Sequence, residues 1–294
     1  MQLLTTPNHT MNFLNIGCGS VFDQDWINLD VDPYSKDVKT WDVRKGLPFA
    51  DNSLDACYSS HVVEHLTSIE AQKLLGECFR VLKRGGVIRL VVPDLEAIAR
   101  LYLNTLTQID MRKSEAELNY DWMMLELYDQ YDWMMLELYD QTVRSYSGGE
   151  MGKYLLAKKN QEFVRSRIGM EAENYWNPIE ALKPKIISKL SSKFSNQALQ
   201  KLRISISSFL VRILNGKEVE TAFREAIFRN SGEIHKWMYD RFSLSRLLEE
   251  CGFVNIKICQ AHESSITDFN SYSLDIIDGK VRKPDSLFIE ALKP

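Results

Sequence analysis

A short apolar run that ends in a glycine turn constrains the fold of this chain more than any other feature. Leu14–Ile16 leads into Gly17-Cys18-Gly19, and a second apolar run, Ile27–Val31, follows and contains Asp30. Glycine has no Cβ, so the backbone can approach a ligand closely, and a carboxylate can accept hydrogen bonds from ribose hydroxyls. The pattern predicts a strand–turn–strand unit that binds a nucleoside, although such glycine turns also occur in α/β proteins without a ligand.

Apolar runs and helical patterns continue to alternate along the chain. Leu54–Ser59 and Val87–Val92 predict two further strands. Between them, Thr67 and Glu70 have the spacing of a capping box, so we expect a helix that begins there and ends at Gly85-Gly86. Alternation of this kind implies a parallel sheet with right-handed crossovers.

The same alternation returns near the C-terminus. Ser243 is expected to cap a helix that ends at Gly252, and Val254–Cys259 and Ser286–Ala291 predict two closing strands. The chain between the two parts is poor in strand patterns and rich in helical ones. We therefore expect a sheet domain formed by residues 11–95 and 231–294, with residues 96–230 as a helical insertion.

The insertion contains an internal duplication. Tyr120–Gln130 is repeated without a change as Tyr131–Gln141. Eleven residues are close to three α-helical turns, so a helix can absorb the duplication whereas a strand cannot. We interpret it as the lengthening of a lid helix. The alternative is that its two Trp-Met-Met-Leu patches form a partner surface, such as a homodimer contact.

The composition is that of a globular protein and excludes several other classes. The five cysteines are odd in number and form no C-x-x-C pair, which argues against a disulfide framework and a thiolate zinc site. There is neither a basic and apolar leader nor an uncharged apolar run of about 18 residues. We therefore expect a cytoplasmic protein without a membrane span.

The net charge of −4 conceals a basic region, because residues 150–230 carry 15 lysines and arginines against 8 acidic residues. Ala181–Gly216 has no acidic residue, and apolar residues alternate with its basic ones. One interpretation is a helical lid whose apolar stripe packs on the core. The other is a helix that lies on an anionic membrane surface. We expect no nucleic-acid partner, because the chain is acidic overall and lacks a recognised binding motif. The basic residues are Lys183, Lys185, Lys189, Lys193, Lys201, Arg203 and Arg212.

Several motifs follow the glycine turn in a fixed order. They are the acidic residue that ends the second strand, Asp42 with Leu47-Pro48-Phe49 and Asp55, His61-Val62-Val63-Glu64-His65, and Leu82–Gly86 with Val92-Pro93. In this order and spacing the chain resembles the class I S-adenosylmethionine-dependent methyltransferases, specifically the type 11-like group. The resemblance covers roughly residues 11–95 and 231–294. It implies a Rossmann-like, seven-stranded, mostly parallel sheet, S-adenosyl-L-methionine as cofactor and S-adenosyl-L-homocysteine as product.

The resemblance also assigns roles to the matching positions. The backbone of Gly17, Cys18 and Gly19 is expected along the methionine half of the cofactor, Asp30 at the ribose, and Asp42 with the Val43 amide at the adenine. This chain departs from the family at two positions. Asn15 stands where an acidic residue is usual, and Ser20 where a third glycine is common. The remaining expected cofactor contacts are Asn15, Val31, Ser59 and Ser60.

His61 is expected near the transferable methyl group, as a general base or as a histidine that orders the loop. His61–His65 also matches the H-x-x-E-H spacing of inverted zinc peptidases. We expect no metal there, because no third ligand stands out downstream and the segment lies where the fourth strand ends. His65 and Glu64 are expected to be mainly structural.

A second candidate region is His235–Phe242, which precedes the Ser243 helix. Its aromatic, carboxylate and guanidinium groups suit a sugar or another polyhydroxylated acceptor, and equally suit a packed entry into the helix. His235 and Tyr239 are alternative bases.

The sequence thus predicts an enzyme that methylates an oxygen, with nitrogen as the alternative, of a small molecule or of a cell-surface or lipid-linked glycan. Other hypotheses are an N-methyltransferase of a natural product and a non-catalytic protein that keeps the cofactor fold at a membrane surface. The expected location is the cytoplasm. A further hypothesis is that residues 181–216 make peripheral contact with the inner face of the membrane.

Overall fold

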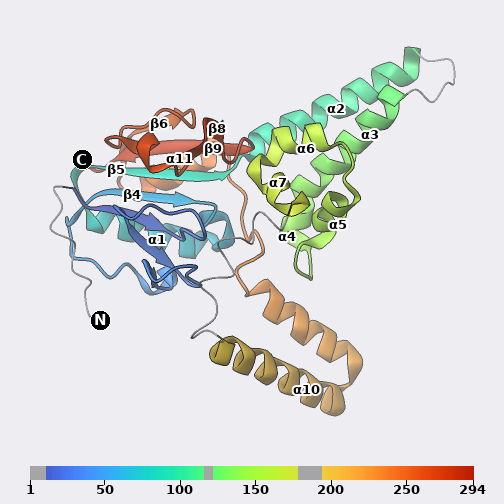
Figure 1. Ribbon diagram of the computed structural model, residues 1–294, viewed down its shortest axis with the longest axis horizontal. Coiled ribbons are helices and arrows are strands. Elements are labelled where there is room, and N and C mark those ends of the chain that lie inside the picture. The colour runs from blue at the N-terminus through green and yellow to red at the C-terminus, as the bar shows by residue number, and fades with distance from the viewer. Residues whose placement is uncertain (1–10, 116–121, 178–193) are drawn as a thin grey trace.

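The computed structural model describes residues 11–115, 122–177 and 194–294. Their centre is a seven-stranded sheet with the order β3-β2-β1-β4-β5-β9-β6 (Figure 1). The first five strands are parallel, and β9 lies antiparallel between β5 and β6. The strands are β1 Phe13–Ile16, β2 Ile27–Asp30, β3 Val38–Thr40, β4 Leu54–Ser60, β5 Leu82–Pro93, β6 Val254–Cys259 and β9 Ser286–Leu292.

Side chains alternate between the two faces of this sheet, as the twofold period of a strand requires. Leu14 and Leu90 face a core that also contains α1 (Ser68–Val81) and α11 (Arg241–Glu250). Phe13 and Val91 face a second core. That second core is closed by the chain between β6 and β9, which carries the short hairpin of β7 (Ile276–Ile277) and β8 (Lys280–Val281).

Three details differ from the sequence-based expectations. Helix α1 has the expected capping box at Thr67 and Glu70 but ends at Val81 rather than at Gly85-Gly86, because β5 begins at Leu82 and the N–H of Gly85 donates to the carbonyl of Lys293. Helix α11 is capped by Asp240 rather than by Ser243, which is its third residue. The strand β3 was not assigned from the sequence, because three residues with one buried side chain leave little periodic signal.

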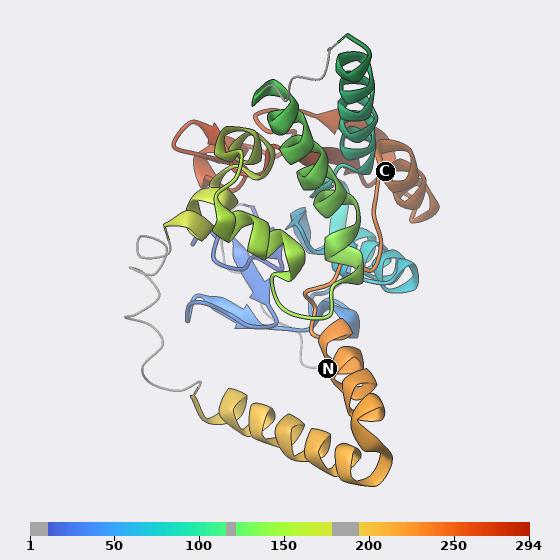
Figure 2. The same cartoon turned by 90° about the vertical axis from the view of Figure 1, so that its right-hand side faces the viewer.

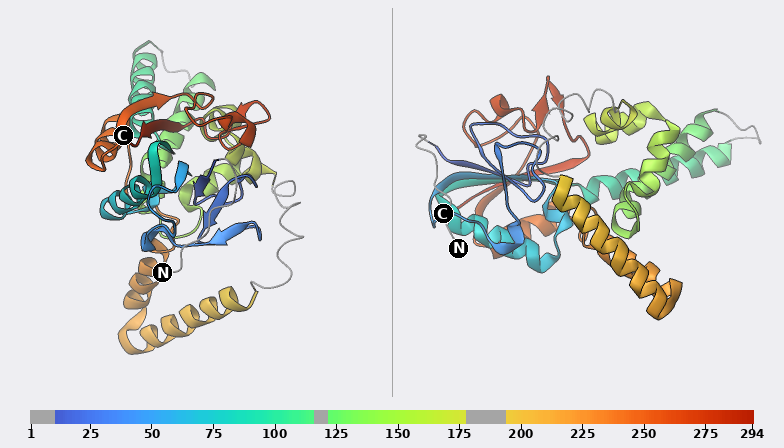
Figure 3. Two further views of the ribbon diagram at one scale, coloured as in Figure 1. Left: turned by 90° about the vertical axis from the view of Figure 1, so that its left-hand side faces the viewer. Right: turned by 60° about the horizontal axis from the view of Figure 1, so that its bottom comes forward.

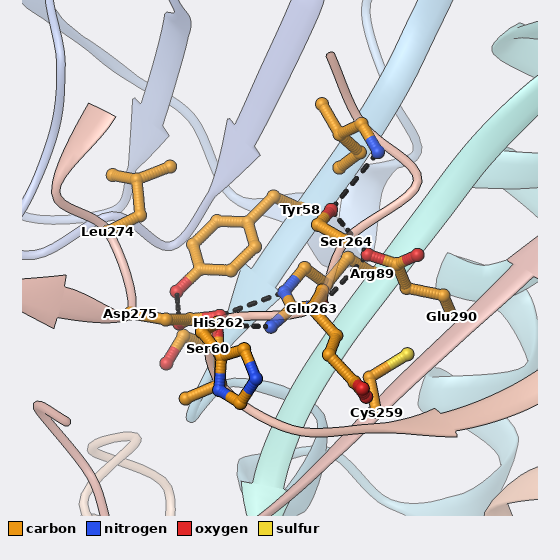
Figure 4. Close-up of polar contacts among 12 residues, drawn as sticks. Tyr58, Ser60, Arg89, Cys259, His262, Glu263, Ser264, Leu274, Asp275 and Glu290 are labelled. Atoms are coloured by element: carbon orange, nitrogen blue, oxygen red, sulfur yellow. Dashed lines mark hydrogen bonds and ion pairs between the residues drawn. The ribbon is translucent and has the colours of Figure 1, made fainter. Parts of the chain in front are cut away.

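A buried arginine fastens the covering chain to the second face of the sheet (Figure 4). Arg89 of β5 forms ion pairs of 2.8 Å with Asp275 and Glu290, and donates to the carbonyl of Glu263 at 2.7 Å. Tyr58 of β4 donates to Asp275 at 2.5 Å. Because Arg89 and both carboxylates are buried, this network determines how residues 260–285 lie on the sheet.

The described part of the insertion consists of helices that gather beyond the ends of the strands (Figure 1). The strands β4 and β5 both point toward them, and α2 follows β5 directly. The helices are α2 Leu95–Glu115, α3 Trp122–Met135, a π-helical turn Leu136–Asp140, α4 Gln141–Val143, α5 Gly149–Ala157, α6 Gln161–Ile168, α7 Met170–Trp176 and α10 Phe194–Arg229. A separate apolar core, which includes Trp133, Leu155 and Trp176, joins α2, α3, α5, α6 and α7, and α10 contributes none of its described side chains to it.

The two copies of the duplication have different environments. In the second copy Trp133 and Met134 are completely buried. In the first copy the corresponding Trp122 is 69% exposed and Met123 is 39% exposed. Tyr120 and Asp121 lie outside the described residues. The second copy therefore supplies the core, and the described residues of the first lengthen α3; the partner surface stays a prediction.

Helix α10 projects from the rest of the molecule (Figures 1 and 3). Its two arms meet at a sharp bend (Figure 2), and the helical backbone is interrupted at Gly216, whose φ is +85°. Ile206, Phe209 and Ile213 lie on one side of the first arm and are 51–62% exposed. The expectation that this apolar stripe packs on the core is therefore wrong for these residues. Lys183, Lys185, Lys189 and Lys193 lie outside the described residues.

None of the helices in the described ranges is both long and apolar enough to cross a membrane.

Candidate active site

A cavity of about 290 Å³ lies at the carboxyl ends of β1 and β2. Of the sequence-predicted residues, it is lined by Gly17, Asp30, Val31, Asp42 and Val43, and His61 closes one side. Asn230 to Gly232, which follow α10, form another part of its wall. Ligands of open α/β sheets bind in this position, beyond the carboxyl ends of the strands.

The glycine turn is held close to its surroundings. Gly17 has a φ of +64°, and a Cβ added to it would lie 2.4 Å from Cγ2 of Val62. The N–H groups of Gly17 and Cys18 both donate to the carbonyl of Leu29, at 2.8 and 3.1 Å. The turn is thus fixed against β2, and its backbone can approach a ligand without side chains between them.

The two predicted carboxylates lie at this cavity with partners of their own. Asp30 accepts from the N–H groups of Gly19 and Asp32, both at 2.8 Å. Asp42 accepts from Arg44 Nε at 2.8 Å and Nη2 at 2.9 Å. These hydrogen bonds from Arg44 lower the pKa of Asp42. Each carboxylate oxygen can accept more than one hydrogen bond, so both residues are able to bind hydroxyl or amino groups as well.

A second cavity, of about 470 Å³, lies between the sheet and the inserted helices, and we call it the helical cavity. Pro93 and Asp285 line it from the sheet side, and Glu137, Arg144 and Glu171 line it from the helices. The size is typical of small-molecule sites.

Two of its acidic residues are paired with cations. Arg167 donates to Glu137 at 2.7 Å, and Lys283 forms an ion pair with Glu171. Burial raises the pKa of Asp285 to about 7. The cavity therefore combines charged and apolar wall residues, and Glu137 and Glu171 are paired with cations.

The two cavities share a wall. His61, His65 and Gly232 line both of them. A group bound in one cavity can thus approach a group bound in the other beside these residues.

Comparison with known families identifies the part of the chain that forms the first cavity. Residues 14–90 match the family model described as a methyltransferase domain. The chain therefore contains a methyltransferase domain, and its sheet has the class I fold. The cofactor of this family is S-adenosylmethionine, and the seven-stranded, mostly parallel sheet is the one that the resemblance implied.

Several solved structures are similar to the chain. An S-adenosylmethionine-dependent methyltransferase of Thermotoga maritima is 10% identical over 97% of this chain and 83% of its own, with a TM-score of 0.36. One of Archaeoglobus fulgidus is 13% identical over 96% and 86%, with a TM-score of 0.34. A Haloferax volcanii chain, from a complex with the methyltransferase activator Trm112, is 21% identical over 32% and 49%, with a TM-score of 0.26. The chain thus spans about half the length of that last relative. A search of curated proteins found no match.

Five of the residues predicted to contact the cofactor do not line the first cavity. Asn15 is buried and donates to Val21 and Asn28 on the second face of the sheet. Ser60 accepts from Arg282 at 2.6 Å, and the buried hydroxyl of Ser59 has no hydrogen-bond partner in the described residues. Cys18 and Gly19 belong to the turn but do not line the cavity either. Their contacts with the methyltransferase cofactor stay predictions.

Of the three predicted bases, His61 and His235 line the helical cavity and Tyr239 lines neither cavity. His61 Nε2 lies 2.8 Å from Ser286 Oγ, and His61 Nδ1 lies 3.2 Å from Glu64 Oε1. Burial lowers the pKa of His61, and burial lowers that of His235 to about 2, so both rings are neutral. Burial raises the pKa of Tyr239 to about 12, which keeps its hydroxyl protonated.

The rest of the predicted acceptor segment is used differently. Asp240 caps α11, and Arg241 forms an ion pair with Glu96 at 2.7 Å. Trp237 and Phe242 are 51% and 69% exposed, so neither packs in the interior. Sequence reasoning missed the residues that line the helical cavity from the insertion, such as Glu137 and Arg144. Glu137 lies in the duplicated segment, whose repeat does not indicate a binding site, and Arg144 follows α4 without a recognisable motif.

Glu64 is the other residue whose environment the sequence did not reveal. Its side chain is completely buried, and neither carboxylate oxygen has a hydrogen bond of acceptable geometry from the described residues. Burial raises its pKa to about 8. A carboxylate in such a position is costly unless it meets a ligand or carries a proton.

Proposed function

We propose that this protein transfers the methyl group of S-adenosylmethionine to an oxygen atom of a polar small molecule or glycan in the helical cavity. The observation that carries the proposal is the wall shared by the two cavities at His61, His65 and Gly232. It brings a donor held by the methyltransferase domain next to a separate site for an acceptor. We propose accordingly that residues 11–95 and 231–294 hold the cofactor and that residues 96–230 select the acceptor.

The residues of the first cavity fit the cofactor. The close backbone of Gly17 leaves room for a ligand, Asp30 can accept from ribose hydroxyls, and Asp42 and Val43 lie where an adenine ring would be held. When bound, the cofactor supplies a methyl group already activated by its positive sulfur. The main contribution of the protein is then to orient donor and acceptor for in-line transfer.

The helical cavity favours a neutral hydroxyl as acceptor. Glu137 and Glu171 are each paired with a cation, which makes them weak sites for a positively charged amine. Neutral His61 and His235 lie on the cavity wall, and the unprotonated nitrogen of a neutral imidazole can accept a hydrogen bond from a hydroxyl. Together these features support O-methylation over N-methylation.

Calorimetry with S-adenosylmethionine and S-adenosylhomocysteine tests the donor site. We expect both to bind, and Asp30→Ala to weaken binding about tenfold or more, because hydrogen bonds to a charged group contribute about 1.5–3 kcal/mol. Asp37→Ala is the matched control, since Asp37 is exposed and does not line the cavity. If the wild type binds neither compound, the proposed methyltransferase activity is excluded. If Asp30→Ala binds them as tightly as the wild type, Asp30 does not bind the ribose.

The acceptor is tested with isotope-labelled S-adenosylmethionine and fractions of small molecules and glycans. The carbon chemical shift of the transferred methyl group in the product separates an O-methyl from an N-methyl group. We expect an O-methyl product. A product methylated on nitrogen contradicts the choice of acceptor atom while leaving the donor site intact.

We propose in addition that α10 brings the enzyme to an anionic membrane surface. The exposed apolar stripe of its first arm, with Phe209 61% exposed, lies beside Lys201, Arg203 and Arg212. Flotation with anionic vesicles is expected to recover less of Phe209→Asp than of the wild type, because the charge disrupts the apolar stripe. Phe242→Asp is the control and is expected to float like the wild type, because Phe242 is exposed as well (69%) but lies outside α10. Equal recovery of the two variants contradicts a membrane role for this arm.

A further inference from the structure

Glu64, His65 and His235 form a cluster in the wall between the two cavities. Glu64 and His65 belong to the short 3-10 turn Val63–His65, and His235 comes from the segment that follows α10. One ligand atom from each residue lies within 4.8 Å of the other two. His65 Nε2 is 3.9 Å from Glu64 Oε1, and the two imidazole rings are 4.8 Å apart at their centres.

The cluster contains buried polar atoms without hydrogen bonds from the described residues, one of which, Glu64 Oε1, lies at ion-pair distance from His61 Nδ1. Glu64 is completely buried and His235 is 6% exposed. Both carboxylate oxygens of Glu64 and Nδ1 of His235 lack a hydrogen bond in the part of the chain that the structure describes. Leaving buried polar atoms without hydrogen bonds is destabilising, so three such atoms in one cluster point to a missing ligand.

We propose that Glu64, His65 and His235 bind one divalent transition-metal ion, of which zinc fits the donor set best. Two histidines and one glutamate are the protein ligands of a common class of catalytic zinc site, which leaves a fourth position open. Because His65 and His235 line the helical cavity, that position is accessible to a water molecule or to an oxygen of a bound molecule. Metal binding does not depend on the proposed methyl transfer.

The surroundings orient the ligands as metal sites require. His65 Nδ1 lies 3.1 Å from the carbonyl of Ile234, to which it donates, so the lone pair of Nε2 is left on the side of Glu64. Metal-binding histidines are usually oriented by such a bond to their other nitrogen. His61 Nδ1, at 3.2 Å from Glu64 Oε1, is placed to orient the carboxylate in the same way.

The backbone also holds the two halves of the cluster together. The N–H groups of Lys236 and Trp237 both donate to the carbonyl of Glu64, and the N–H of His235 donates to the carbonyl of Gln141. Zinc bonds of about 2.0–2.1 Å place tetrahedral ligand atoms roughly 3.4 Å apart. The ligand atoms, which lie within 4.8 Å of one another, therefore need to approach by up to roughly 1.4 Å for zinc to bind all three.

The experiment uses the full-length protein after treatment with a chelator and dialysis. Zinc is titrated by calorimetry, in competition with a chelator of known affinity. We expect one zinc ion per chain, with affinity reduced about tenfold or more in Glu64→Gln and in His235→Ala. His262→Ala is the control and is expected to bind like the wild type, because this exposed histidine lies outside the cluster.

Cobalt spectroscopy gives a second measurement. It uses the wild-type protein, so its result does not depend on whether a variant folds. Cobalt in a four-coordinate site of this type is expected to give intense visible absorption bands, and added zinc is expected to remove them. Absence of these bands, or zinc affinity unchanged in both folded cluster variants, overturns the proposal. Neither result bears on S-adenosylmethionine binding, which is measured separately.

Discussion

At the scale of single residues, the cofactor site depends on the backbone of one glycine. Gly17 has a left-handed φ of +64°. In addition, the side chain of Val62 occupies the space where a Cβ of residue 17 would lie. Gly19 has a similar φ of +56° but nothing within 4 Å of its Cβ position. The two positions therefore separate the cost of backbone conformation from the cost of a steric clash.

Gly17→Ala is expected to destabilise the protein more than Gly19→Ala. Both pay about 1–2 kcal/mol for the left-handed conformation, and Gly17→Ala adds roughly 1–3 kcal/mol of overpacking against Val62. Chemical denaturation of the two variants measures the difference. Equal losses of stability mean that Val62 moves aside freely.

The residue scale also shows what the sequence can predict. Gly17, Asp30 and Asp42 were found because a local motif fixes both their residue type and their place at the strand ends. Ser60 was expected at the cofactor, but its partner Arg282 is 222 residues away and no local pattern announces it. Asn15 likewise donates to Asn28, and both side chains lie on the second face of the sheet.

At the scale of elements, the duplicated segment shows how identical sequences take different roles. The second copy lies where α3 meets the other inserted helices, and its Trp133 and Glu137 are buried there. The first copy forms the N-terminal part of α3, where Trp122 is exposed. Helical periodicity was sufficient to predict a lengthened helix. Which copy is buried depends on tertiary packing, which two identical sequences cannot reveal.

Alanine substitution at the two tryptophans compares the same residue in the same local sequence. Trp133→Ala is expected to reduce the free energy of unfolding by about 3–5 kcal/mol, because it leaves a large cavity in the core. Trp122→Ala is expected to change it by about 0.5 kcal/mol or less. Thermal and chemical unfolding check both values, and similar losses in the two variants contradict the assignment of the core to the second copy.

At the scale of the whole molecule, the sheet and its covering chain are joined through Arg89. This arginine is completely buried between Asp275 and Glu290, which are far from it in sequence. Neither the ion pairs nor the helical cavity could be predicted from the sequence, because both form only when distant segments pack. A seven-stranded, mostly parallel sheet could be predicted, because strands alternate with helices along the chain and the family motifs accompany them.

Arg89→Met is expected to destabilise the protein by about 3–5 kcal/mol, because it leaves Asp275 and Glu290 buried without their cation. Arg246→Met removes an exposed ion pair with Glu250 and is expected to cost about 1 kcal/mol or less. Denaturation curves of the two variants provide the comparison. A loss for Arg89→Met as small as that for Arg246→Met contradicts the structural role of the buried pair.

A crystal structure with bound S-adenosylhomocysteine tests the central claim most directly. The account predicts the ribose at Asp30, the adenine near Asp42, and the sulfur beside His61, directed toward the helical cavity. A nucleoside bound elsewhere, or a sulfur directed away from the helical cavity, would contradict the assignment of donor and acceptor sites.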